Sequence, residues 1–136
     1  MTKNIRCIMV GNFLRENDPT EITRVSFENM KSGFFQAEVE LERTGSSSFN
    51  LKGTMEDQFG TSKIEGKILG PLLKFYKTYI KPKGHALTEE IFYDLGRVND
   101  HKHDPEIKGS FVGSWSSNAE GKGIAGRAAC SFIFEG

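Results

Sequence analysis

Hydrophobic and polar residues alternate along most of this 136-residue chain. In residues 34–42, FFQAEVELE, every second residue from Phe35 onward is apolar, and the residues between them are glutamine or glutamate. A period of two is typical of a β-strand with one face buried and the other in water. The same alternation predicts strands over residues 48–55, 63–69, 72–80, 90–97, 107–115 and 124–136, and near residues 5–11 and 22–29.

The chain lacks a convincing helical stripe, and only residues 71–79 are ambiguous between helix and strand. Eight or nine short strands joined by short turns predict an all-β fold. We expect one domain over residues 1–136, an antiparallel up-and-down β-barrel of about eight strands. Because the first and last strands of such a barrel pair, Cys7 and Cys130 should point inward on neighbouring strands, close together but not bonded.

Glycines interrupt the apolar face of several predicted strands. Five of them lie on the inward phase: Gly53, Gly66, Gly109, Gly113 and Gly126. Such glycines let the wall of a small barrel curve tightly, or they leave room for a ligand inside. Packing and curvature is the interpretation we favour, although one barrel can be packed at one end and hollow at the other.

Charge and composition exclude several kinds of partner. Lysine plus arginine equals aspartate plus glutamate, at 18 each, which argues against nucleic acid as a partner. The sequence also lacks a stretch that approaches a membrane span, and the first residues do not resemble a signal peptide. We therefore expect a cytoplasmic protein with two buried thiols and no membrane partner.

Four polar or aromatic residues share the inward phase on the later predicted strands: Lys77, Tyr79, Tyr93 and Trp115. They predict a ligand pocket at one end of the barrel, with aromatic walls and an amine that pairs with an anionic group. The alternative is a filled core in which the aromatic residues only pack and the Lys77 amine reaches water at the rim.

The segment DHKHDP, residues 100–105, is rich in metal-ligand types. On a strand, His101 and His103 would share a face, and Asp104 or His85 could add a third ligand for zinc. The same residues are also typical of a turn, because aspartate forms local side-chain turns and Pro105 breaks strand pairing. The spacing matches no established metal motif, so we predict a solvated hairpin loop and no bound metal.

Four stretches in order, FNLKGTM, IEGKILGPLLKFYKTY, IFYDLGRV and IKGSFVGSW, resemble the small barrels of the calycin type over about half of the chain. The order is most similar to the avidin and streptavidin family and also resembles lipocalin-like domains. The resemblance implies a ligand-binding barrel that often assembles into oligomers. Trp115 is the single tryptophan, whereas avidin-type biotin sites use several, so the ligand is not expected to be biotin.

The leading hypothesis is therefore non-enzymatic binding of a small apolar or anionic molecule inside the barrel. One alternative is a filled barrel whose outer face binds another protein or a second copy of the chain. Another is a barrel enzyme of the cyclase or isomerase type, which needs only a few polar groups in a hollow barrel. The sequence shows neither a nucleophile–base motif nor a phosphate loop or dinucleotide fingerprint, so no catalytic residue and no cofactor is predicted.

Overall fold

The computed structural model describes residues 4–15, 33–83, 89–98, 107–117 and 124–134. These ranges contain eight strands: β1 (Asn4–Arg15), β2 (Phe34–Arg43), β3 (Ser48–Asp57), β4 (Gly60–Leu69), β5 (Leu72–Pro82), β6 (Ile91–Val98), β7 (Ile107–Ser117) and β8 (Ile124–Phe134). They contain no helix long and apolar enough to cross a lipid bilayer.

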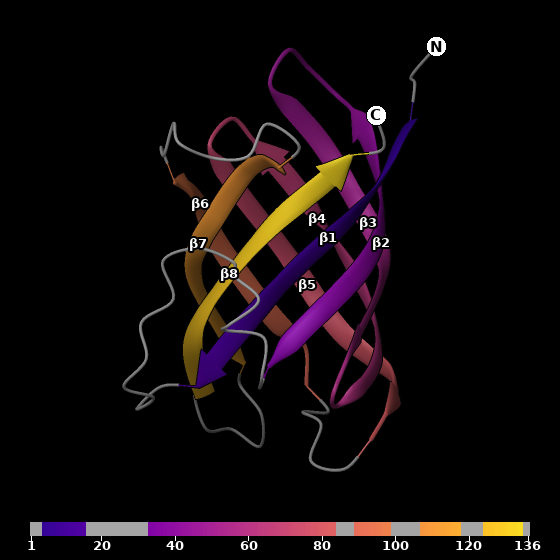
Figure 1. Cartoon of the computed structure of the whole chain (residues 1–136), viewed down its shortest axis with the longest axis vertical. Coiled ribbons are helices and arrows are strands. Elements are labelled where there is room, and N and C mark those ends of the chain that lie inside the picture. Colours follow the sequence, from indigo (N-terminus) through magenta and orange to yellow (C-terminus); the bar gives the residue numbers. More distant parts are fainter. Residues whose placement is uncertain (1–3, 16–32, 84–88, 99–106, 118–123, 135–136) are drawn as a thin grey trace.

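The strands form a closed antiparallel barrel in which each strand pairs with the next along the chain (Figure 1). The last strand, β8, returns to β1, with Met9 opposite Phe132, and this pairing closes the barrel. The predicted all-β, up-and-down barrel of about eight strands is thus confirmed. Residues 72–79 of the ambiguous segment belong to strand β5, and Pro71 lies in the turn before it. The strand expected near residues 22–29 lies outside the described residues.

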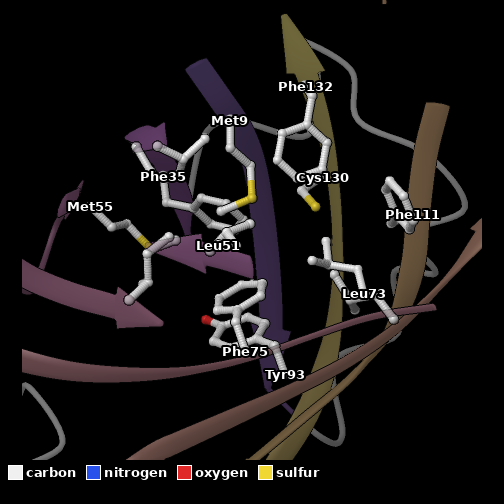
Figure 2. Close-up of a cluster of buried hydrophobic side chains, with 14 of the residues drawn as sticks. Met9, Phe35, Leu51, Met55, Leu73, Phe75, Tyr93, Phe111, Cys130 and Phe132 are labelled. Carbon is white, nitrogen blue, oxygen red and sulfur yellow. The ribbon is translucent and has the colours of Figure 1, made fainter. Parts of the chain in front are cut away.

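The interior of the barrel is filled at its centre by large side chains from almost every strand (Figure 2). The rings of Phe75 and Tyr93 stack face to face, with centroids 4.5 Å apart and planes inclined by 8°. Phe35 meets the Tyr93 ring edge-on at 6.3 Å, and Phe111 meets Phe132 edge-on at 5.8 Å. Offset and edge-on rings at these distances pack favourably. Aromatic contacts therefore contribute to the centre of a core that also contains many aliphatic side chains.

Inward-facing glycines allow neighbouring strands to approach closely. A Cβ atom at Gly66 would lie 2.0 Å from the carbonyl oxygen of Lys74, and one at Gly113 would lie 2.1 Å from that of Asp94. At Gly53 the same atom would lie 2.2 Å from the carbonyl oxygen of Glu38. Backbone of the adjacent strand occupies the space in each case. At these positions the glycines allow close packing of neighbouring strands, as the favoured interpretation predicts.

The two cysteines are buried free thiols on paired strands, as predicted, but they are not close together. Cys130 lies opposite Gly11, whereas Cys7 lies opposite Phe134, four positions further along the ladder. At about 3.3 Å per residue this offset separates the Cα atoms by roughly 13 Å, which is too far for a disulfide bond. The expected proximity was wrong because pairing of the strands does not fix their register.

Candidate binding site at one end of the barrel

The β3–β4 turn directs a carboxylate into the barrel. Asp57 ends β3 and pairs with Gly60, the first residue of β4. Its Oδ1 atom accepts a hydrogen bond of 2.8 Å from the backbone N–H of Phe59, a local contact that is typical of aspartate in turns. Gly60 has φ of 118°, a conformation that side chains other than glycine rarely adopt. Turn geometry therefore fixes the carboxylate on the inner side of the wall.

Asp57 and Lys77 form an ion pair inside the barrel. The Lys77 ammonium donates to Asp57 Oδ2, and neither side chain is exposed by more than 1%. The Tyr79 hydroxyl donates to the same oxygen at 2.8 Å. Both oxygens of the Asp57 carboxylate thus accept hydrogen bonds. Such contacts are required to keep a buried charge ionised, because its water shell has been removed.

Aromatic rings surround the amine. Lys77 Nζ lies 4.7 Å from the ring centroid of Tyr79, 5.1 Å from that of Phe13 and 6.0 Å from that of Tyr93. These distances lie within the range of cation–π attraction. Phe13 also meets Trp115 edge-on, with centroids 6.3 Å apart. Together, the Lys77–Asp57 pair and these four aromatic residues form what we call the end cluster.

The end cluster lies at the end of the barrel where β1 and β3 end and where β4 begins (Figure 1). Strand β4, which lies between the strands of the ion pair, carries a small buried residue here. Ser62 of β4 is buried, lies opposite Tyr79 and donates to the carbonyl oxygen of Met55 at 3.4 Å. Its small side chain is compatible with Lys77 on β5 reaching Asp57 on β3 across β4.

Burial changes the proton affinity of the groups in the end cluster. Loss of water contact lowers the pKa of Lys77, and the nearby Asp57 carboxylate only partly opposes this shift. Burial also raises the pKa of Tyr79. The hydrogen bond to Asp57 and the negative charge of Asp57 raise it further. The pKa of Tyr93 is raised mainly by burial. The phenols are therefore neutral at physiological pH, and the Lys77 amine loses its proton more easily than an exposed lysine does.

The structure brings together the four residues that the alternation selected. Lys77, Tyr93 and Trp115 are buried, and Tyr79 is half-buried against them. The alternative in which the Lys77 amine reaches water at the rim is wrong, because the Lys77 side chain is 1% exposed and its amine is paired with a carboxylate.

Sequence reasoning missed two members of the end cluster. Asp57 continues the inward phase of Phe49, Leu51 and Met55, but the predicted strand ended at residue 55. Phe13 likewise continues the inward phase of Cys7 and Met9 beyond the predicted limit of the first strand. Extending the period of two by one step in each strand would have found both residues.

The weak metal candidates His101, His103 and Asp104, together with His85, lie outside the described residues. Within the ranges that the structure describes, no group of three or more histidine, cysteine, aspartate and glutamate side chains is placed to hold a metal ion. The prediction of a solvated hairpin loop at residues 100–105 therefore stays a prediction.

The outer wall carries a second feature. A hollow of about 970 Å³ lies over the outer wall and is lined by residues of β1 to β6, among them the charged Lys63, Glu65 and Lys74. Tyr76 and Phe92 lie opposite each other there, with ring centroids 4.9 Å apart, and Ile80 is 56% exposed. Apolar side chains that share an exposed sheet face are typical of an interaction surface.

Comparisons of the chain with protein families, with characterised proteins and with solved structures find no match. The closed eight-stranded barrel is consistent with the calycin type in general. The finer resemblance to avidin or to lipocalin-like domains stays a prediction.

Proposed function

We propose that the protein binds a small, uncharged and partly apolar molecule at the end cluster, without converting it. The buried Lys77–Asp57 pair with its hydrogen-bonded Tyr79 supports this proposal most directly. A buried ion pair adds little to stability compared with apolar residues of similar size, so stability alone does not account for it. Clusters of ionisable groups with shifted pKa values are frequent at binding sites.

The charge of the end cluster favours a neutral ligand. The positive charge of Lys77 is balanced by Asp57, which accepts hydrogen bonds through both oxygens. An anionic ligand would compete with Asp57 for the ammonium group and leave a buried carboxylate without its partner, at a cost of several kcal/mol. Neutral compounds with an aromatic or aliphatic body avoid this cost and contact the surrounding rings.

Trp115 provides the measurement, because it is the single tryptophan and contacts Phe13 within the end cluster. We would titrate the protein with benzyl alcohol, benzoate and benzylamine while recording tryptophan fluorescence. Benzyl alcohol should give a saturable change, and the two charged compounds a much weaker one. Absence of a saturable change with all three compounds, and of any small molecule in native mass spectra of the protein purified from its source, would contradict the proposal.

Two tyrosines on the same strand offer a matched pair of variants. Tyr79→Phe removes a hydroxyl within the end cluster, whereas Tyr76→Phe removes one on the outer wall, where the side chain is 49% exposed. Binding of benzyl alcohol should weaken at least tenfold in Tyr79→Phe and remain unchanged in Tyr76→Phe. Equal effects of the two substitutions would argue against binding at the end cluster.

A second candidate function is binding of another protein, or of a second copy of the chain, through the outer wall of β4 to β6. The exposed Tyr76 and Ile80 and the adjacent hollow support it. Sedimentation over a concentration series should then show a discrete oligomer that Ile80→Glu dissociates and Ser114→Glu, at an exposed position on β7 outside the hollow, does not. A constant monomer mass would contradict self-assembly.

A further inference from the structure

The described part of the chain contains one buried lysine. Lys77 is 1% exposed, whereas Lys74, three residues earlier on the same strand, points outward and is exposed. The Lys77 amine is enclosed by aromatic rings and hydrogen-bonded to a carboxylate. Amines in such surroundings act as nucleophiles towards carbonyl compounds, because the enclosure favours the uncharged amine and the carboxylate can carry protons.

We propose that the Lys77 amine condenses reversibly with an aldehyde or ketone bound at the end cluster and forms an imine. The inference rests on the proposed function, because the carbonyl compound must occupy the same end of the barrel. It goes beyond that function by giving the ligand a reactive group and the lysine a covalent role.

The reaction balances with the groups that the end cluster contains. The Lys77 ammonium passes a proton to Asp57, and its nitrogen lone pair then attacks the carbonyl carbon. A proton moves from the attacking nitrogen to the carbonyl oxygen, which becomes the hydroxyl group of a carbinolamine. Transfer of a proton from Asp57 to this hydroxyl releases one water molecule and leaves the carbon–nitrogen double bond. The sequence consumes no oxidant or reductant.

The reaction preserves the charge balance of the end cluster. Before the reaction, one ammonium faces one carboxylate within the barrel. A protonated imine on Lys77 carries the same single positive charge, so Asp57 remains its counter-ion. The incoming aldehyde and the departing water are both neutral. The buried site therefore keeps zero net charge throughout, which avoids the large cost of an unpaired charge in an apolar environment.

Tyr79 supports the same chemistry as a positioning residue. Its hydroxyl donates to Asp57 Oδ2, the oxygen that also receives the Lys77 hydrogen bond. Because burial keeps the phenol neutral, it remains a hydrogen-bond donor over the whole physiological pH range. This bond holds the carboxylate beside the amine.

The test uses benzaldehyde as the probe and cyanoborohydride to trap the imine as a stable benzylamine on the intact protein. Near neutral pH, exposed lysines are almost fully protonated and react slowly. Peptide mapping by mass spectrometry should find Lys77 modified at least tenfold faster than Lys74. Lys77→Met should lose the fast modification and retain the slow one. Modification of Lys77 no faster than that of Lys74 in the unsubstituted protein would overturn the inference.

Benzyl alcohol separates failure of this inference from failure of the proposed function. If benzyl alcohol changes Trp115 fluorescence saturably but benzaldehyde does not label Lys77, the imine is wrong and the binding site stands. If neither compound binds, both proposals are wrong. Tyr79→Phe should slow labelling of Lys77 several-fold while leaving the labelling of Lys74 unchanged, which a merely structural role of the tyrosine would not produce.

Discussion

Lys77 on β5 and Asp57 at the end of β3 form a buried ion pair that crosses the intervening strand β4. The pair thus connects strands that do not hydrogen-bond to each other in the sheet. Its two side chains are charged, whereas the side chains packed around them are uncharged. Burying a charge is costly unless the charge is paired. Several consequences of this arrangement and of the barrel around it can be measured.

Removal of the carboxylate should strongly destabilise the protein. Asp57→Asn leaves the Lys77 ammonium without a counter-charge, and breaking a buried pair in this way costs about 3–5 kcal/mol. The free energy of unfolding in urea should fall by this amount. Lys74→Met, on the exposed side of the same strand, should change it by less than about 0.5 kcal/mol.

The double variant Asp57→Leu with Lys77→Met provides the control for this prediction. Replacing both charges by apolar side chains removes the unpaired ion, so most of the lost stability should return. A double variant as unstable as Asp57→Asn would show that packing of these side chains, rather than their charge, accounts for the loss.

Stability should fall at alkaline pH. Burial raises the pKa of the Cys7 thiol from 9.0 to about 11 and raises the pKa values of Cys130, Tyr79 and Tyr93. The unfolded chain releases these protons at the ordinary values of 9.0 and 10.0, whereas the folded chain retains them. The unfolded state therefore binds fewer protons above about pH 9, and the free energy of unfolding decreases as pH rises.

Lys77 acts in the opposite direction, because its pKa is lowered from 10.5 in the folded chain. The single lysine does not cancel the two cysteines and two tyrosines. The free energy of unfolding should therefore still fall with rising pH, by about 1.4 kcal/mol per pH unit for each net proton. Urea unfolding at several pH values from about 8 upward measures the slope. Tyr93→Phe should make the decline above pH 10 shallower, whereas an unchanged slope would show that this phenol does not contribute.

Both thiols should resist modification in the folded protein. Cys7 is 6% exposed and Cys130 is fully buried, and their raised pKa values leave little of the reactive thiolate near neutral pH. A thiol-specific disulfide reagent should modify neither residue in buffer and both in concentrated urea. Rapid modification of Cys130 in buffer would indicate local opening of the β1–β8 pairing.

Alanine at two strand glycines should give opposite results. Gly66→Ala places a methyl group 2.0 Å from the carbonyl oxygen of Lys74 and should destabilise the barrel by about 3 kcal/mol. Gly96→Ala, where a Cβ atom would meet nothing within 4 Å, should leave the melting temperature nearly unchanged. Equal effects at the two positions would mean that the β4–β5 contact relaxes at little cost.

The alternation of residues predicted the fold well because a closed barrel buries one face of every strand. In β2, for example, Phe35, Ala37 and Val39 are buried, and the glutamine and glutamate between them are exposed. Residues far apart in sequence, such as Tyr79 and Trp115, could be assigned to one interior for the same reason. Periodicity therefore located the candidate site without any family motif.

Two features were beyond the reach of periodicity, whereas Asp57 was missed only because the predicted strand ended at residue 55, one step of the alternation too early. The separation of Cys7 from Cys130 depends on the register of β1 and β8, which a pattern of period two does not determine. Pairing of Lys77 with Asp57 depends on the three-dimensional path of strands that are not neighbours.

Closure of the barrel by β1 and β8 also has a kinetic consequence. The strand that is made first must wait for the strand made last before its second edge is paired. Contacts between residues so distant in sequence slow folding, because the chain loses much entropy before it gains them. Until β8 arrives, the edge of β1 can pair with other chains. Refolding at low protein concentration should therefore raise the yield of monomeric barrel, because it reduces pairing of β1 with other chains. The gain should be larger than for a helical protein of equal length.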